Sequence, residues 1–251
     1  NAPSFLLGKK PIQTHRIVSE GVTIDITILE DTIEEDLFRR DFTMNSMAYD
    51  VTGDEVIDTE QGMADIRRHL IRYPHKETVR ADPLRMLKAV RHYATLKKFR
   101  LDNLLIGAIT EMGDLIKMVA PERVKVEMDQ IMASPGVYQA LLMLEETGLL
   151  FRIFPELLPL KALDKEKGFL LETYGHMRDA FRYLPRYARS YRLDGKTLKE
   201  AGYALLFHDL GKASTYSYDE AKDAVHFFFH EKESKTLATL IMERLRFSTH
   251  E

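Results

Sequence analysis

The chain contains no cysteine. This absence excludes disulfide bonds and thiolate metal ligands, so any metal ion would depend on histidine and carboxylate side chains. There is also no run of about 18 apolar residues, the length that a transmembrane helix needs. The first residues, Asn1, Ala2 and Pro3, show neither the charged start nor the apolar stretch of a signal peptide. We therefore expect a cytoplasmic protein that is not embedded in a membrane.

What is present is an ordinary globular composition of 251 residues, of which 45% are hydrophobic and 30% charged. This length suits one large domain or two to three small ones. The net charge of −3 excludes no class of partner, but the charges are unevenly spread. Eleven Lys and Arg residues lie between Ile66 and Leu101, against only Glu77 and Asp82. A solvated helix face normally carries interspersed acids, so this excess predicts contact with nucleic acid or a nucleotide.

The first thirty residues contain two predicted elements. Residues 5–8, Phe-Leu-Leu-Gly, read as the end of a helix, with Pro11 shortly beyond it. Residues 21–29 alternate apolar and polar side chains, which predicts a β-strand with one apolar face. Asp25 lies in the middle of that strand, where a carboxylate is unfavourable unless it has a partner or a function. The alternative is an exposed strand face.

The segment 35–50 is the part of the chain around which we expect the site to be organised. Arg39 and Arg40 offer planar forks that match phosphate oxygens, and Asp41 and Asn45 can take hydroxyl groups or hold the arginines. Nearby apolar side chains can anchor the segment in a core. These residue types predict a pocket for a nucleoside triphosphate, and a charged turn is the alternative.

A helix is predicted after Asp82, with Pro83 in its first turn. Asp82 and Arg85 are three residues apart and would share one face of that turn. An aspartate acceptor beside an arginine donor can hydrogen-bond the Watson–Crick edge of a nucleobase. The alternative is a simple helix cap with an ion pair.

The last third of the chain contains a second group of candidate metal ligands. His208 and Asp209 are adjacent, and both residue types bind divalent ions without thiolates. His226 and His230 are four residues apart, so on a helix they would share a face. The candidate ligands of this site are His176, His208, Asp209, His226 and His230.

Residues 39–45, Arg-Arg-Asp-Phe-Thr-Met-Asn, closely resemble the RRDFTxN motif of the class II tRNA nucleotidyltransferase and bacterial poly(A) polymerase family. Residues 206–212 similarly resemble the signature of HD domains. The resemblance to the nucleotidyltransferase family implies that residues 39–45 bind the triphosphate and ribose of the incoming nucleotide. The nucleotide-binding residues that it implies are Arg39, Arg40, Asp41, Asn45, Asp82, Arg85 and Arg91. It further implies that Asp25 is a catalytic, metal-binding carboxylate, and that Glu122 and Arg123 brace the nucleotide-reading helix.

The sequence departs from the family pattern at two places. The family carries an Asp-x-Asp pair before the strand of Asp25, and residues 1–24 contain none. We interpret this as the omission of segments from the chain rather than as a loss of catalysis. The second departure is Ala81, which stands where the family's base-reading motif begins with glutamate, and it leaves the details of base choice open.

The implied fold class is α+β. It comprises a small mixed α/β nucleotidyltransferase head at residues 1–65, a basic helical neck at 66–150 and an all-α HD-type body at 151–251. The implied reaction is addition of C, A or both from CTP and ATP to the 3′ end of tRNA, with release of pyrophosphate. Mg²⁺ would serve the head, and a second divalent metal ion is an option at the HD site. The neck residues expected to contact the tRNA acceptor end are Arg67, Arg68, Lys88, Lys97 and Lys98.

Two other functions remain open from the sequence, and no DNA partner is expected. A poly(A) polymerase shares the same motifs and would add A tails to RNA. An HD-type metal phosphohydrolase with a degenerate head belongs to a different class, and it would bind RNA without extending it.

Overall fold

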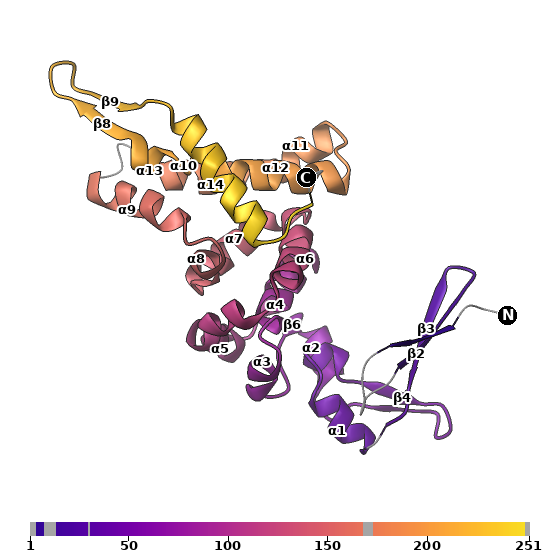
Figure 1. Ribbon diagram of the computed structural model, residues 1–251. Coiled ribbons are helices and arrows are strands. Elements are labelled where there is room, and N and C mark those ends of the chain that lie inside the picture. Colours follow the sequence, from indigo (N-terminus) through magenta and orange to yellow (C-terminus); the bar gives the residue numbers. More distant parts are fainter. Residues whose placement is uncertain (1–3, 8–13, 30, 168–172, 249–251) are drawn as a thin grey trace.

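The computed structural model describes residues 4–7, 14–29, 31–167 and 173–248. The chain runs from a strand-containing head at one end, through a helical neck, to a helical body at the other end (Figure 1). This order matches the α/β head, helical neck and helical body that the sequence predicts. The domain boundaries themselves stay a prediction, because the buried core is continuous from Phe42 to Leu245 and does not break near residue 150.

The head contains short strands and short helices. Its strands are β1 (Ser4–Leu7), β2 (Thr14–Ser19), β3 (Val22–Thr27), β4 (Ala48–Asp50) and β5 (Glu55–Ile57). Its helices are α1 (Ile33–Phe38), the 3₁₀ turn η1 (Thr43–Asn45) and α2 (Gly62–Arg67). Strands β1, β2 and β3 form an antiparallel sheet, and β4 and β5 form a hairpin. The predicted helix end at residues 5–8 is therefore wrong, because Ser4–Leu7 pairs with β2 as an edge strand; Gly8 and Pro11 lie outside the described residues.

Strand β3 has one apolar and one polar face, as the alternation of residues 21–29 predicts, whereas the neighbouring strands place Phe5 and Val18 on the polar side. Leu6, His15 and Ile26 lie opposite one another in the register, and so they share a face. Arg16 lies opposite Asp25 on the other face. The apolar face is not buried by the described residues, since the side chain of Ile26 is 51% exposed.

The neck begins where the chain enters the buried core. Its strands are β6 (Leu70–Ile71) and β7 (Arg100–Leu101), which pair in parallel. Its helices are α3 (Glu77–Ala81), α4 (Arg85–Thr95), α5 (Asn103–Met112), the 3₁₀ helix η2 (Gly113–Met118), α6 (Pro121–Met132) and α7 (Val137–Glu146). Helix α4 is central, because it packs against both α6 and α7. Its apolar face is fully buried, so the residues that flank this face are held rigidly.

Proline and glycine stand at two helix boundaries of the neck, where both are typical. Pro121 begins α6, and Gly148 follows α7 in the left-handed conformation, with φ of +74°. The start of α4 differs from the prediction, because Pro83 lies in a turn before the helix. In this turn, the Asp82 carboxylate accepts the backbone N–H of Leu84 at 3.3 Å.

The body is helical apart from one hairpin. Its helices are α8 (Leu149–Ile153), α9 (Leu157–Lys167), α10 (Thr173–Ala180), α11 (Leu184–Ser190), α12 (Gly195–Phe207), α13 (Lys212–Thr215) and α14 (His230–Arg244). Its strands are β8 (Tyr216–Asp219) and β9 (Ala224–Phe227), which project as an antiparallel arm (Figure 1). The prediction that His226 and His230 share a helix face is wrong, because the first lies in β9 and the second begins α14. Among the described residues, no helix is long and apolar enough to cross a membrane.

Candidate functional site: a nucleotide site between head and neck

Helix α1 positions the double-arginine segment. Thr32 caps the helix by accepting the backbone N–H of Glu35 at 3.3 Å, and the Glu35 carboxylate accepts the N–H of Thr32 at 3.2 Å. This reciprocal cap satisfies backbone donors that would otherwise lack partners at the helix start. The helix ends at Phe38, and Arg39 is its C-cap residue. Arg39 and Arg40 are therefore presented together at the C-terminal end of a short, capped helix.

Asp36 holds both arginines. One of its carboxylate oxygens accepts Nη2 of Arg39 at 2.7 Å, and the other accepts Nη2 of Arg40 at 2.8 Å. Each arginine also donates through Nε at 3.1 Å. Burial disfavours the charged carboxylate of Asp36, but the hydrogen bonds from Arg40 and Arg39 outweigh it and lower its pKa. Both arginine side chains remain about half exposed, and Nη1 of Arg39 lies 3.7 Å from the carboxylate of Asp31.

The polar residues that follow the arginines form a connected group. Asp41 accepts the side-chain amide of Asn45 at 3.0 Å and the backbone N–H of Phe42 at 2.9 Å. The ammonium group of Lys88, on the neck helix α4, lies 3.9 Å from the second carboxylate oxygen of Asp41. Three of the predicted site residues, Asp41, Asn45 and Lys88, are thus brought together from two elements.

Buried anchors hold this segment against the neck. Phe42 is 1% exposed and meets the ring of His92 edge-on, at 5.3 Å between ring centroids. Thr43 donates to the carboxylate of Asp65 at 2.7 Å, and Arg72 donates to the same oxygen at 2.9 Å. Asp65 is 1% exposed, so these two donors compensate a buried charge. No role for Asp65 follows from the sequence alone, because Thr43 lies 22 positions away from it.

His92 lies beside the polar group on helix α4. Burial, followed by the positive charge of Arg91, lowers the pKa of His92 from 6.5 to about 4. The imidazole is therefore neutral near pH 7, and it serves as an uncharged packing surface for Phe42. No candidate role was assigned to His92 from the sequence.

Arg85 links the neck helix to the double-arginine segment. Its guanidinium donates to the carbonyl oxygens of Arg39 at 2.9 Å, Thr78 at 3.2 Å and Arg40 at 3.4 Å. Asp82, the other predicted base-reading residue, accepts Nη2 of Arg123 at 3.1 Å. The structure thus brings Arg85 next to the predicted phosphate-binding arginines, more than forty positions away in the sequence.

Helix α6 contacts helix α4 and the turn before it through two ion pairs. One is the pair between Arg123 and Asp82. The other joins Nε of Arg91 to the Glu127 carboxylate at 2.7 Å, and the Glu127 side chain is 8% exposed. Arg123 thus contacts the turn before α4, whereas Glu122 lies 4.0 Å from Arg246, so the bracing role of the two residues stays a prediction. Arg91, predicted to bind the nucleotide, is engaged with Glu127 in this structure.

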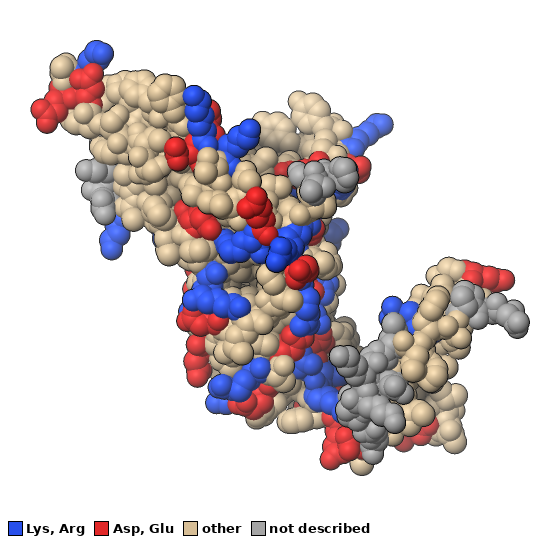
Figure 2. Space-filling model, in the orientation of Figure 1, with Lys and Arg blue, Asp and Glu red and all other residues tan. Residues whose placement is uncertain are grey.

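The predicted RNA-contacting cations of the neck are mostly free at the surface. Arg67, Arg68, Lys97 and Lys98 are exposed, and none of them makes an ion pair with a residue that the structure describes. Lys88 differs, since it is partly buried and faces Asp41. Figure 2 shows Lys and Arg side chains gathered over the neck, with acidic side chains from other segments among them. The local excess of cations in the sequence is therefore partly compensated in space.

The predicted metal-binding carboxylate of the head, Asp25, forms an ion pair. It accepts Nε and Nη2 of Arg16, both at 2.7 Å, and the hydrogen bond from Arg16 lowers its pKa. The described part of the chain contains no group of three His, Asp or Glu side chains arranged to hold a metal ion. The described residues of the head therefore do not form a metal site.

In the body, only part of the predicted HD set comes together. Nε2 of His208 lies 3.1 Å and Nε2 of His230 lies 3.6 Å from the carboxylate of Asp209. The ammonium group of Lys212 donates to the same carboxylate at 2.7 Å. Burial opposes the charge of Asp209, but the hydrogen bonds from His208 and Lys212 outweigh it and lower its pKa to about 2. The hydrogen bond to Asp209 raises the pKa of His208.

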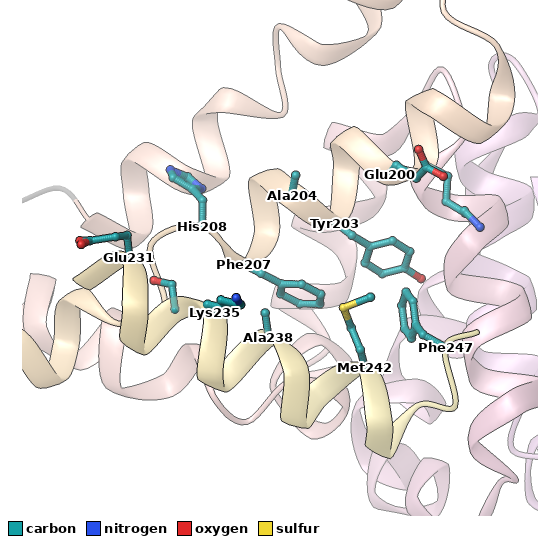
Figure 3. Close-up of a pocket in the computed structure, with 12 residues that line it drawn as sticks. Glu200, Tyr203, Ala204, Phe207, His208, Glu231, Lys235, Ala238, Met242 and Phe247 are labelled. Atoms are coloured by element: carbon teal, nitrogen blue, oxygen red, sulfur yellow. The ribbon is translucent and has the colours of Figure 1, made fainter. Parts of the chain in front are cut away.

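The remaining HD candidates lie elsewhere. His226 stacks on Phe228 at 4.8 Å between ring centroids, and His176 lines a separate pocket near Asp179. A second pocket, of about 400 Å³, lies beside His208 between α12 and α14 (Figure 3). Its walls are largely apolar, with the aromatic ring of Phe207 pointing inward.

Comparison with known proteins agrees with this arrangement. Residues 9–72 match the family described as "Poly A polymerase head domain", and residues 98–160 match "Probable RNA and SrmB- binding site of polymerase A". The A-adding tRNA nucleotidyltransferase of Deinococcus radiodurans is 31% identical, over 92% of this chain and 52% of that protein. The CC-adding tRNA nucleotidyltransferase of Thermus thermophilus is 32% identical, over 93% of this chain and 53% of that protein.

The fold is also similar to a solved structure. The Thermotoga maritima CCA-adding enzyme complexed with tRNA has a TM-score of 0.66 at 22% identity, covering 99% of this chain and 53% of that chain. The chain thus spans about half the length of the curated relatives it matches. With both matched segments, the double-arginine motif and the fold in agreement, this chain belongs to the class II tRNA nucleotidyltransferase and bacterial poly(A) polymerase family.

Proposed function

We propose that this chain is the nucleotide-binding part of an enzyme that adds C, A or both from CTP and ATP to the 3′ end of tRNA. The observation that carries the proposal is the convergence of the two predicted motifs. Arg85 donates to the carbonyl oxygens of Arg39 and Arg40, which are themselves aligned by Asp36. Groups suited to phosphate and groups suited to a base thus lie within one site.

The arginine pair supports a role in binding the triphosphate. With Asp36 fixing their inner edges, the guanidinium groups of Arg39 and Arg40 can each offer further N–H donors to phosphate oxygens. Asp41 and Asn45 would hold the ribose hydroxyls beside them. This arrangement is preorganised, so little side-chain entropy is lost when the nucleotide binds.

Asp82 and Arg85 would read the base by exchanging partners. In this structure, Arg85 donates to backbone carbonyls and Asp82 accepts from Arg123. A cytosine or adenine edge offers both donors and acceptors, so it could replace some of these hydrogen bonds without leaving a polar group unsatisfied. Ala81 lies at the start of this motif, and its small side chain contributes no hydrogen bond to base choice.

The proposed reaction is nucleotidyl transfer. The 3′-hydroxyl oxygen of the RNA attacks the α-phosphorus, the bond to the β-phosphate oxygen breaks, and pyrophosphate leaves. This family generally uses a divalent metal ion, for which Mg²⁺ is our proposal. Because Asp25 is paired with Arg16 and the described residues do not form a metal site, we assign no step to the metal.

The acceptor and the compartment are also proposals. The exposed cations of the neck suit the phosphates of a tRNA acceptor end, which such side chains bind without reading sequence. We propose a cytoplasmic location, in keeping with the absence of cysteine. Neither a membrane nor DNA is required as a partner.

Two alternatives each rest on one observation. The head family is named for poly A polymerases, which supports tailing of RNA with A as the second candidate. The approach of His208 and His230 to Asp209 supports a phosphohydrolase as the third. Its metal ion remains a proposal, because the described residues of the HD region form no three-ligand group.

Nucleotide binding and transfer can be tested separately. Binding of a fluorescent ATP analogue to this chain should weaken about tenfold or more in Arg40→Ala, which removes a charge-assisted fork, and should be unchanged in Lys196→Ala. Equal affinity of both variants would refute the proposed site. Incorporation of labelled CTP or ATP into tRNA transcripts ending before CCA or after CC, by the full-length protein, identifies the transfer. Long A tails on an unrelated RNA would instead identify a poly(A) polymerase.

A further inference from the structure

Helix α11 of the body carries an aromatic and basic surface that the proposed site does not use. Tyr187 lies in this helix, and Tyr183 and Tyr191 are its two cap residues. The three tyrosines are four positions apart, so they share one face. One arginine lies between each successive pair of tyrosines, and a third follows the last tyrosine. The residues of this surface, which we name the Tyr–Arg ridge, are Tyr183, Arg186, Tyr187, Arg189, Tyr191 and Arg192.

The ridge is rigidly supported from below. Phe181 is fully buried, and Leu184 and Ala188 are 6% and 8% exposed, so the opposite face of the helix is packed into the body. The tyrosines above it are open, with Tyr187 58% and Tyr191 72% exposed. An exposed aromatic cluster of this kind marks an interaction site, because isolated exposed rings are common but aligned ones are not needed for folding.

The tyrosine rings already have the geometry of a stacking platform. The rings of Tyr187 and Tyr191 are nearly parallel, with 16° between their planes and 6.3 Å between their centroids. Tyr183 and Tyr187 also line a groove of about 690 Å³ between α11 and α12. Leu193 and Ala204 contribute to its apolar lining. A flat ring can therefore stack on the tyrosines with its edge against this lining.

The arginines of the ridge are electrostatically uncompensated. Arg186, Arg189 and Arg192 are exposed, and none of them forms an ion pair with a residue that the structure describes. The sequence contains no Asp or Glu between Phe181 and Leu193. Neither binding of a protein partner nor a purely structural role requires such an excess of positive charge, whereas binding of a polyanion does.

We propose that the Tyr–Arg ridge binds unpaired nucleotides of the RNA acceptor, with bases stacked on its tyrosines and phosphates held by its arginines. Aromatic stacking with basic side chains is how proteins bind single-stranded nucleic acid without reading its sequence. The ridge lies on the body, whereas the nucleotide site lies between α1 and α4 at the other end of the chain (Figure 1). The inference rests on the proposed function only in taking RNA as the partner.

The test is RNA binding by the 251-residue chain in the absence of ATP and CTP, so that it does not depend on catalysis. The probe is a fluorescein-labelled, unstructured oligoribonucleotide of about 12 nucleotides, and affinity is read by anisotropy. Tyr187→Ala should weaken binding about tenfold, whereas Tyr187→Phe should retain it because its ring still stacks. Tyr218→Ala is the matched control, since Tyr218 is 49% exposed on the β8–β9 hairpin.

Salt dependence tests the arginines. Arg186→Ala should weaken binding a few-fold at low salt and reduce the salt slope by about 0.7, the value for one phosphate contact on a single strand. Lys222→Ala, at the tip of the hairpin, should leave both values unchanged. Because the chain has no tryptophan, its tyrosine emission is directly visible. RNA should quench this emission in the unmodified chain, and less so in Tyr187→Ala.

Three outcomes would overturn the inference. They are equal RNA affinity of Tyr187→Ala and Tyr218→Ala, equal losses in Tyr187→Ala and Tyr187→Phe, and an unchanged salt slope in Arg186→Ala. The substituted side chains are exposed, so far-ultraviolet circular dichroism should match the unmodified chain. Failure of nucleotide incorporation by the full-length protein would refute the proposed function but leave these binding results unaffected.

Discussion

The ion pair between Arg91 and Glu127 allows two roles of Arg91 to be separated. The family resemblance predicts that Arg91 binds the nucleotide, whereas the structure places its guanidinium 2.7 Å from a carboxylate on the neighbouring helix α6. The Glu127 side chain is only 8% exposed. If Arg91 stabilises the packing of α4 against α6, then its removal leaves the buried carboxylate of Glu127 without a compensating charge. The free energy of unfolding should then fall.

The size of this response has a limit. Breaking a buried ion pair by removing one partner typically costs about 3–5 kcal/mol. A buried unpaired carboxyl can escape the penalty by protonating, and for an ordinary glutamate this costs about 3.7 kcal/mol at pH 7 but only about 1 kcal/mol at pH 5. We therefore expect Arg91→Ala to lower the free energy of unfolding by about 3 kcal/mol at pH 7 and by clearly less at pH 5.

The assay is urea unfolding followed by circular dichroism at both pH values. The double variant Arg91→Ala, Glu127→Gln should recover about 2 kcal/mol at pH 7, because a neutral amide needs no compensating charge. Glu127→Gln alone should cost about 1 kcal/mol, since the remaining arginine is 21% exposed and can reach water. ATP affinity is measured in parallel under conditions where each variant is folded.

One result would refute the bracing role. If Arg91→Ala loses less than about 0.5 kcal/mol at pH 7 and ATP affinity falls tenfold, then Arg91 contacts the nucleotide and Glu127 is not dependent on it.

Three further predictions concern the same site and its support. The pKa of His92 is near 4, below its ordinary 6.5, so the neutral imidazole contributes stability that is present above pH 6.5 and is lost as the pH falls toward 4. The expected loss in the free energy of unfolding is about 2 kcal/mol after allowance for partial exposure. Unfolding of His92→Phe should not show this loss, and equal pH profiles of the two proteins would contradict the assignment. Asp36→Asn should weaken ATP binding about three- to tenfold in a titration, because the two arginines lose the carboxylate that aligns them, and unchanged affinity would argue against preorganisation. Gly136→Ala should lower the free energy of unfolding by about 2–3 kcal/mol, because the new Cβ would lie 2.4 Å from the carbonyl oxygen of Ala94. The control Gly107→Ala places its Cβ in open space and should raise the free energy of unfolding by about 0.5–1 kcal/mol.

Local patterns predicted those features that depend on neighbouring residues. The alternation of residues 21–29 predicted β3. This prediction succeeds because strand alternation is governed by backbone geometry over a few residues. The double-arginine motif was likewise recognisable, since its residues are contiguous. The strand Ser4–Leu7 was missed, because its edge pairing with β2 has no signature within four residues.

Only the tertiary structure decided which residues meet. The sequence determined that Arg39, Arg85 and Arg91 carry guanidinium groups suited to phosphate or carboxylate. It did not determine which partner each of them would have. The fold places Arg85 on the carbonyl of Arg39 and Arg91 on Glu127, and it separates His226 from His230 by a strand boundary. Such contacts span tens of residues, and they are fixed by how α4 packs between the head and α6. Hydrogen-bonding capacity is thus a property of the residue, whereas its partner is a property of the packed fold.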